Sequence, residues 1–150
     1  MTFAQRMMST SAPRAAAFVR CIVGAVFLSE GIQKFLFPVE LGTGRFAHIG
    51  IPWPEVSAPF VGACEIACGV LLIAGLLTRA AALVMIINMS VAICSTKIPM
   101  LLAKGFWPFA HESRVDFSML CGCLMFLLIG AGGVSVDHLL ERSPREKRPQ

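Results

Sequence analysis

The chain has 150 residues, of which 56% are hydrophobic and only 15% charged, with a mean hydropathy of +0.73. A soluble domain of this length is about 25% charged, so the composition favours an integral membrane protein. The formal net charge is +4, but the basic residues lie at the ends of apolar stretches. They therefore indicate membrane topology, and no nucleic-acid surface is expected.

Four apolar stretches have the length of a membrane span, which needs about 20 mostly apolar residues. They run over residues 15–37, 56–77, 80–98 and 115–133. The stretches predict an all-α fold: an integral membrane four-helix bundle with antiparallel, up-and-down topology. Residues 1–14 and 141–150 are predicted tails, and the bundle uses nearly all of the remaining chain.

The first stretch contains Arg20, Glu30 and Lys34 and is too long for the apolar part of a signal peptide, so we expect a retained helix. The connection over residues 38–55 is rich in glycine and proline and carries Trp53. Since aromatic residues favour the membrane interface, we expect this connection to lie along the membrane surface.

The second and third stretches are separated only by residues 77–79, which predicts an antiparallel helical hairpin. Residues 99–114 are predicted to form a second long connection. A run of small residues over positions 62–69 predicts a close helix–helix interface. The six cysteines fall inside the stretches without zinc or C-x-x-C spacing, so we interpret them as packing residues and expect no metal site.

The distribution of Lys and Arg predicts that both termini are cytoplasmic. The side with the tails and the tight turn carries seven basic residues. These are Arg6, Arg14, Arg79, Arg142, Arg145, Lys147 and Arg148. Arg79 is expected to anchor the turn at the cytoplasmic surface, and Arg20 to extend its side chain to the lipid head groups.

Charged residues inside a span must be paired, hydrated or near an interface. Glu30 and Lys34 have the i,i+4 spacing of a local ion pair, for which we favour a structural role. Glu65 lies near the middle of its stretch without a local partner. Burial without a base would favour its protonated form, so Glu65 is the best candidate for a functional residue and a proton carrier.

The predicted pocket for a ligand or proton gathers acids and bases in the outer half of the bundle. Its members are Glu30, Lys34, Glu65, Lys97, Arg114 and Asp116. The structural alternative is a set of buried ion pairs that keeps the helices in register. Asn88 is expected to hydrogen-bond another helix, whereas His111 is expected to be an ordinary polar surface residue.

Several sequence segments, in this order and spacing, resemble the DoxX family of small membrane proteins. They are Arg20, residues 24–27, 30–35 and 46–52, Glu65, and residues 69–72, 75–81 and 130–137. The resemblance covers about residues 15–140 and implies a four-helix membrane bundle. Family relatives include a subunit of a thiosulfate:quinone oxidoreductase and components of membrane oxidoreductase complexes. No agreed catalytic motif accompanies the family.

Three functions remain open at this point. The first is a quinone-proximal or membrane subunit of an oxidoreductase system in the inner membrane. The second is a small carrier or ligand-binding membrane protein with an outward-facing polar pocket, and the third is a non-catalytic membrane scaffold. Because haem, flavin and iron–sulfur motifs are absent from the sequence, a partner subunit or a bound quinone would carry any electrons. Lipid and redox-complex subunits are the expected partners.

Overall fold

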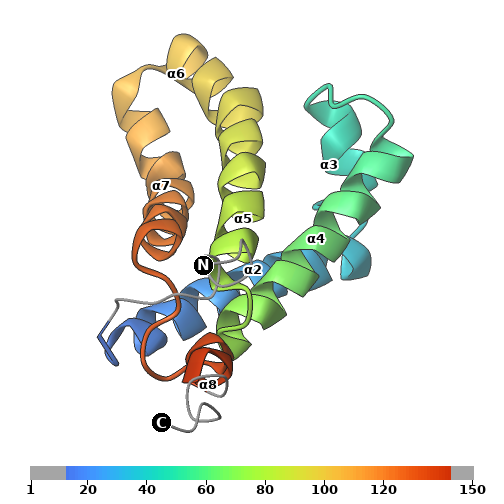
Figure 1. Cartoon of the computed structure of the whole chain (residues 1–150). Coiled ribbons are helices and arrows are strands. Elements are labelled where there is room, and N and C mark those ends of the chain that lie inside the picture. The colour runs from blue at the N-terminus through green and yellow to red at the C-terminus, as the bar shows by residue number, and fades with distance from the viewer. Residues whose placement is uncertain (1–12, 143–150) are drawn as a thin grey trace, which may run out of the picture.

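A computed structural model describes residues 13–142, and every regular element in this range is helical. The elements are α2 (Ala16–Leu36), α3 (Thr43–His48), α4 (Pro54–Ala74), α5 (Thr78–Ala92), the π-helical segment η1 (Ile93–Lys97), α6 (Ile98–Lys104), α7 (Phe106–Ile129) and α8 (Val136–Arg142) (Figure 1). Most of the two predicted tails lies outside the described residues.

Within the described range, three helices are long and apolar enough to cross a membrane. They are α2, α4 and the continuous helix Thr78–Lys104, which joins α5, η1 and α6. The predicted all-α membrane architecture is thereby confirmed. The short turn between α4 and α5 also confirms the predicted hairpin.

The prediction of a long connection over residues 99–114 is wrong, because this segment is almost entirely helical. Gly105, with φ of 82°, is the one non-helical residue between α6 and α7. Pro99 and Pro108 lie in the first turns of α6 and α7. Proline is tolerated at position 108 because the first amide groups of a helix have no intrahelical acceptor. Pro99 instead lies inside the continuous helix, directly after η1, where the π-helical turn already interrupts the regular hydrogen-bond pattern.

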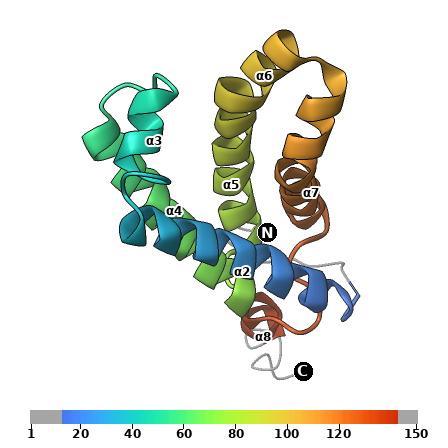
Figure 2. The same cartoon turned by 180° about the vertical axis from the view of Figure 1, so that it is seen from behind.

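The long helices form two pairs. Helix α2 packs along α4, and α5 packs along α7. In both views the α2–α4 pair crosses the lower part of α5 and α7, and the two pairs diverge toward α3 and α6 (Figures 1 and 2). The buried core lies where the pairs cross. Its fully buried apolar members include Phe27, Leu72, Met85, Cys123 and Phe126.

Glycines bring the backbones of α2 and α4 into direct contact at two levels. A Cβ on Gly24 would lie 2.8 Å from the carbonyl oxygen of Gly69, and one on Gly31 would lie 2.7 Å from that of Gly62. In each helix the two glycines are about two turns apart, on the same face. The predicted small-residue interface over residues 62–69 is confirmed, and it has no space for side chains on this face.

The turn between the two pairs is held by Asp137, which is 1% exposed. Its carboxylate accepts hydrogen bonds from the amides of Leu77 (2.8 Å) and Thr78 (3.1 Å). Its own amide donates to the carbonyl of Gly75 at 2.9 Å. Asp137 thus satisfies amides at the start of α5 that have no intrahelical partner.

The expectation that Arg20 extends to the lipid head groups is wrong. Arg20 is 3% exposed, and its guanidinium donates hydrogen bonds to the carbonyls of Ala131 and Val134. These carbonyls follow the end of α7, where no helical amide is available to them. Arg79 donates to the carbonyl of Leu128 at 3.0 Å. Both arginines therefore bind the C-terminal segment of the bundle.

Candidate functional site

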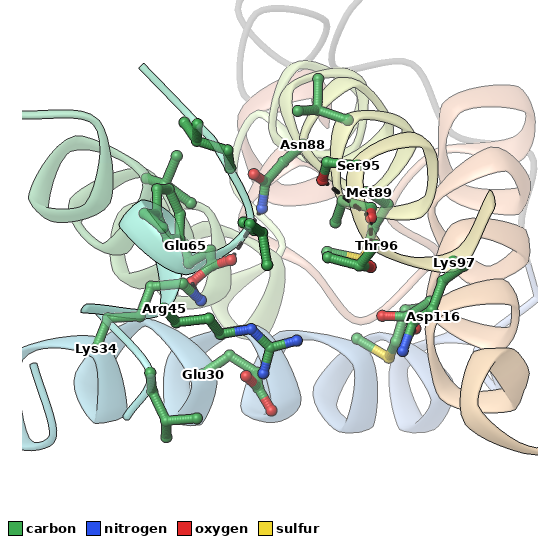
Figure 3. Close-up of a pocket in the computed structure, with 18 of the residues that line it drawn as sticks. Glu30, Lys34, Arg45, Glu65, Asn88, Met89, Ser95, Thr96, Lys97 and Asp116 are labelled. Atoms are coloured by element: carbon green, nitrogen blue, oxygen red, sulfur yellow. Dashed lines mark hydrogen bonds and ion pairs between the residues drawn. The ribbon is translucent and has the colours of Figure 1, made fainter. Parts of the chain in front are cut away.

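A cavity of about 530 Å³ lies between the two helix pairs, with α3 contributing one wall. Its apolar lining includes Val26, Phe27, Phe46, Ile49, Val61, Met89 and Met119. Its charged lining consists of Glu30, Lys34, Arg45, Glu65, Lys97, Glu112 and Asp116, and most of these are labelled in Figure 3. An apolar surface with a few polar groups is typical of a small-molecule site.

The most buried charge in the cavity wall is the carboxylate of Glu65. One of its oxygens accepts from Lys34 Nζ at 2.6 Å, and the other accepts from Asn88 Nδ2 at 2.9 Å. The side chains of Lys34 and Glu65 are 13% and 3% exposed. The network therefore joins α2, α4 and α5 and satisfies both carboxylate oxygens, as burial of a charge requires.

The glycine contacts explain why Lys34 reaches Glu65. Side chains on a helix lean toward its N-terminus. Lys34 follows Gly31 by about one turn of α2, and Glu65 follows Gly62 by about one turn of α4. Because the two helices are antiparallel, Lys34 and Glu65 lie on opposite sides of the Gly31–Gly62 contact. The two side chains therefore lean toward each other across the place where the backbones are closest.

Two predictions about this network are wrong. Lys34 pairs with Glu65 and not with Glu30, and Glu65 has two partners instead of none. Glu65 is therefore not buried without a base, which was the condition for its expected role as a proton carrier. The prediction that Asn88 hydrogen-bonds another helix is confirmed, since Asn88 on α5 donates to Glu65 on α4.

A second ion pair lies on the opposite wall. Lys97 Nζ is 3.1 Å from Asp116 Oδ2 and donates to the carbonyl of Glu112 at 3.0 Å. Lys97 ends η1, and Asp116 and Glu112 belong to α7. This pair is less buried than the first, with side-chain exposures of 12% and 25%.

The wall next to Lys97 is formed by the π-helical turn. Ser95 and Thr96 line the cavity, and their hydroxyls donate to the carbonyl of Ala92 at 3.3 Å and 2.6 Å. π-Helical turns are rare and occur frequently at functional sites, because the wider turn changes the direction in which side chains point. No pattern in the amino-acid sequence predicted this turn.

Five of the six predicted pocket residues line this one cavity, and Arg114 is the exception. Arg114 is exposed, and its guanidinium donates to the carbonyl of His111, which is also exposed. The most important omission from the predicted set is Arg45 on α3, which faces the cavity in Figure 3. The apolar residues Phe46 and Ile49 beside it were the available signal, because they indicate that the connection folds inward.

Membrane-length helices around a cavity that contains ion pairs define a multi-pass α-helical membrane protein. The family model of DoxX matches residues 15–98, and the chain belongs to this family. The match extends from the start of α2 to the start of α6 and includes Lys34, Arg45, Glu65 and Asn88.

Two relatives cover most of the chain. An uncharacterized membrane protein of Mycobacterium tuberculosis is 44% identical over 143 residues, which are 91% of this chain and 88% of that protein. An uncharacterized protein of Haemophilus influenzae is 33% identical over 125 residues, covering 81% of this chain and 87% of that protein. No solved structure matches the chain.

Proposed function

We propose that this DoxX protein crosses the inner membrane four times, with both termini in the cytoplasm. The fourth span is α7, whose 24 residues have a helical length of about 36 Å. The charged residues of α7 are confined to its first half, where they lie near an interface. The seven basic residues of the tails and the tight turn support a cytoplasmic position for that side. A reporter fused after Gln150 is expected to be cytoplasmic, and a periplasmic signal would reverse the orientation.

The function that the geometry supports best is the binding of a small amphipathic ligand in the cavity. The volume of about 530 Å³ carries this proposal. The lining residues Glu30, Arg45 and Glu112 are exposed, so the cavity opens at the surface of the helix bundle and a ligand can enter it. Ligand sites have volumes of about 300–1,000 Å³ and combine apolar walls with a few polar groups.

The DoxX family suggests a setting for this site, namely a membrane subunit beside an oxidoreductase system. A quinone is the neutral candidate ligand in that setting. Phe27, Phe46, Met89 and Met119 supply aromatic and thioether surfaces for a ring.

The proposal is tested by purifying the protein in polymer-bounded native membrane discs and identifying the bound amphiphiles by mass spectrometry. The variant Ala92→Phe adds a ring to the cavity wall and is expected to remove the bound species. The matched control Ala63→Phe adds the same ring on an exposed face of α4 and is expected to retain it. Equal recovery from both variants, or no enriched species in either, would contradict a ligand site and favour the scaffold function.

A carrier is the second candidate, and a neighbouring surface cleft favours it. This cleft shares Arg45, Ile49, Ser95 and Thr96 with the cavity. The cleft and the cavity thus adjoin at these four side chains, and a movement of the side chains would connect the two spaces. Uptake into vesicles that is lost with Ala92→Phe would support transport, whereas binding without uptake would contradict it.

A further inference from the structure

The charged side chains of the cavity fall into two groups. Lys34 with Glu65, and Lys97 with Asp116, are paired across helices. Glu112 lies beside Lys97, which binds its carbonyl. Glu30, Arg45 and Glu112 form the second group, since only the backbone carbonyl of Glu112 is bonded. None of these three side chains has a hydrogen bond or ion pair with any described residue, although all three line the cavity.

The buried Lys34–Glu65 pair is poorly suited to hold a ligand. A ligand that takes Lys34 away from Glu65 leaves a nearly buried carboxylate without its base, and removing one partner of such a pair is strongly destabilising. Asn88 is committed to the same carboxylate. The charges without a side-chain partner are therefore those of Glu30, Arg45 and Glu112, and Glu112 lies apart from the other two, beside the Lys97–Asp116 pair.

Glu30 and Arg45 point into the same part of the cavity from different elements, α2 and α3 (Figure 3). They do not pair with each other, so a ligand group has access to both. An anionic ligand would be repelled by Glu30, and a cationic ligand by Arg45. A neutral ligand can hydrogen-bond to either side chain but compensates neither charge. A ligand with one ammonium and one oxyanion satisfies both side chains.

We propose that the cavity binds the zwitterionic head group of an amphiphile. The ammonium group binds Glu30, and the phosphate or carboxylate binds the guanidinium of Arg45, whose planar donors match either oxyanion. The apolar part of the ligand lies against Phe46, Ile49 and Met89. This inference rests on the proposed ligand site and names a ligand class different from a neutral quinone.

The test uses lysophosphatidylethanolamine as the zwitterionic probe, with binding measured by native mass spectrometry of the protein in non-ionic detergent. The variants Arg45→Gln and Glu30→Gln are each expected to weaken binding about tenfold, as loss of a charge-assisted hydrogen bond does. The controls Arg114→Gln and Glu55→Gln remove the same charges at exposed positions outside the cavity lining. They are expected to leave binding unchanged.

Two further probes identify the source and the charge of the ligand. Free phosphoethanolamine has the same head group without a chain, so its binding indicates a soluble zwitterion and its failure indicates a lipid; either result supports the zwitterionic site. Lysophosphatidic acid lacks the ammonium group. Equal binding of lysophosphatidic acid, unaffected by Glu30→Gln, would overturn the inference in favour of an anion site.

Two outcomes distinguish a wrong ligand class from the absence of any ligand site. If menaquinone binds, is displaced by Ala92→Phe and is unaffected by Arg45→Gln and Glu30→Gln, the cavity is a ligand site but not for zwitterions. If no probe binds the wild-type protein above the level of Ala92→Phe, the ligand-site proposal itself is wrong.

Discussion

The α2–α4 interface and the space between the two helix pairs are built in opposite ways. Along α2–α4, glycines let the backbones touch at Gly24–Gly69 and Gly31–Gly62. Between the pairs, larger side chains such as Asn88 and Met89 face the cavity. In a membrane, where lipid is as apolar as the helix surface, residue size and polar contacts decide how closely helices approach. The α2–α4 interface therefore holds these two helices together, whereas the space between the two helix pairs remains open as the cavity.

The largest loss of stability is expected when a large side chain is placed in the α2–α4 interface. Gly69→Leu places a side chain where even a Cβ would lie 2.7 Å from the backbone nitrogen of Leu28. Because backbone cannot move aside cheaply, we expect a destabilisation of about 4 kcal/mol or more, or loss of folded protein. The free energy of unfolding is measured in mixed micelles. Ala67→Leu, on an exposed part of the same helix, is the control, and similar losses in both variants would disprove the tight interface.

The next largest loss of stability is expected in the network of Lys34, Glu65 and Asn88, which joins the α2–α4 pair to α5. Lys34→Met removes the base that is paired with the Glu65 carboxylate, and the Glu65 side chain is only 3% exposed. We expect the free energy of unfolding to fall by about 3 kcal/mol. The double variant K34M/E65M removes both charges and is expected to recover most of that loss. A double-mutant cycle in the same unfolding assay gives the coupling. Additive losses would show that the two charges act independently.

A smaller effect is expected at the turn that joins the pairs. Asp137→Ala removes the acceptor for the amides of Leu77 and Thr78, and we expect a loss of about 1–2 kcal/mol. Asp137→Asn retains one side-chain oxygen and is expected to lose less. Hydrogen exchange at the start of α5 should accelerate with the alanine variant, and unchanged exchange there would contradict the capping role.

The smallest effect is expected at the more exposed ion pair. Asp116 is 25% exposed in its pair with Lys97, so solvent screens much of the attraction. We expect Asp116→Asn to change stability by about 1 kcal/mol or less. A loss as large as that of Lys34→Met would show that the cavity wall depends on both pairs equally.

Helical spacing alone predicted which residues could meet, but not which of them do. Glu30 and Lys34 are one turn apart on α2, yet Lys34 pairs with Glu65 on α4. Glu30 is exposed and can be solvated, whereas the buried Glu65 requires a counter-charge. Since the unpaired buried charge has the larger energetic penalty, the tertiary pair forms instead of the local one.

The amino-acid sequence by itself determined the helical membrane architecture, the hairpin at residues 77–79 and the small-residue interface. These features follow from apolar length, turn length and residue size, all of which are local. Only the tertiary structure decided that Arg20 binds loop carbonyls, that Arg45 faces the cavity and that Glu65 is paired. A buried polar group takes whichever partner the packing of distant helices brings within reach, and no spacing along a single helix contains that information.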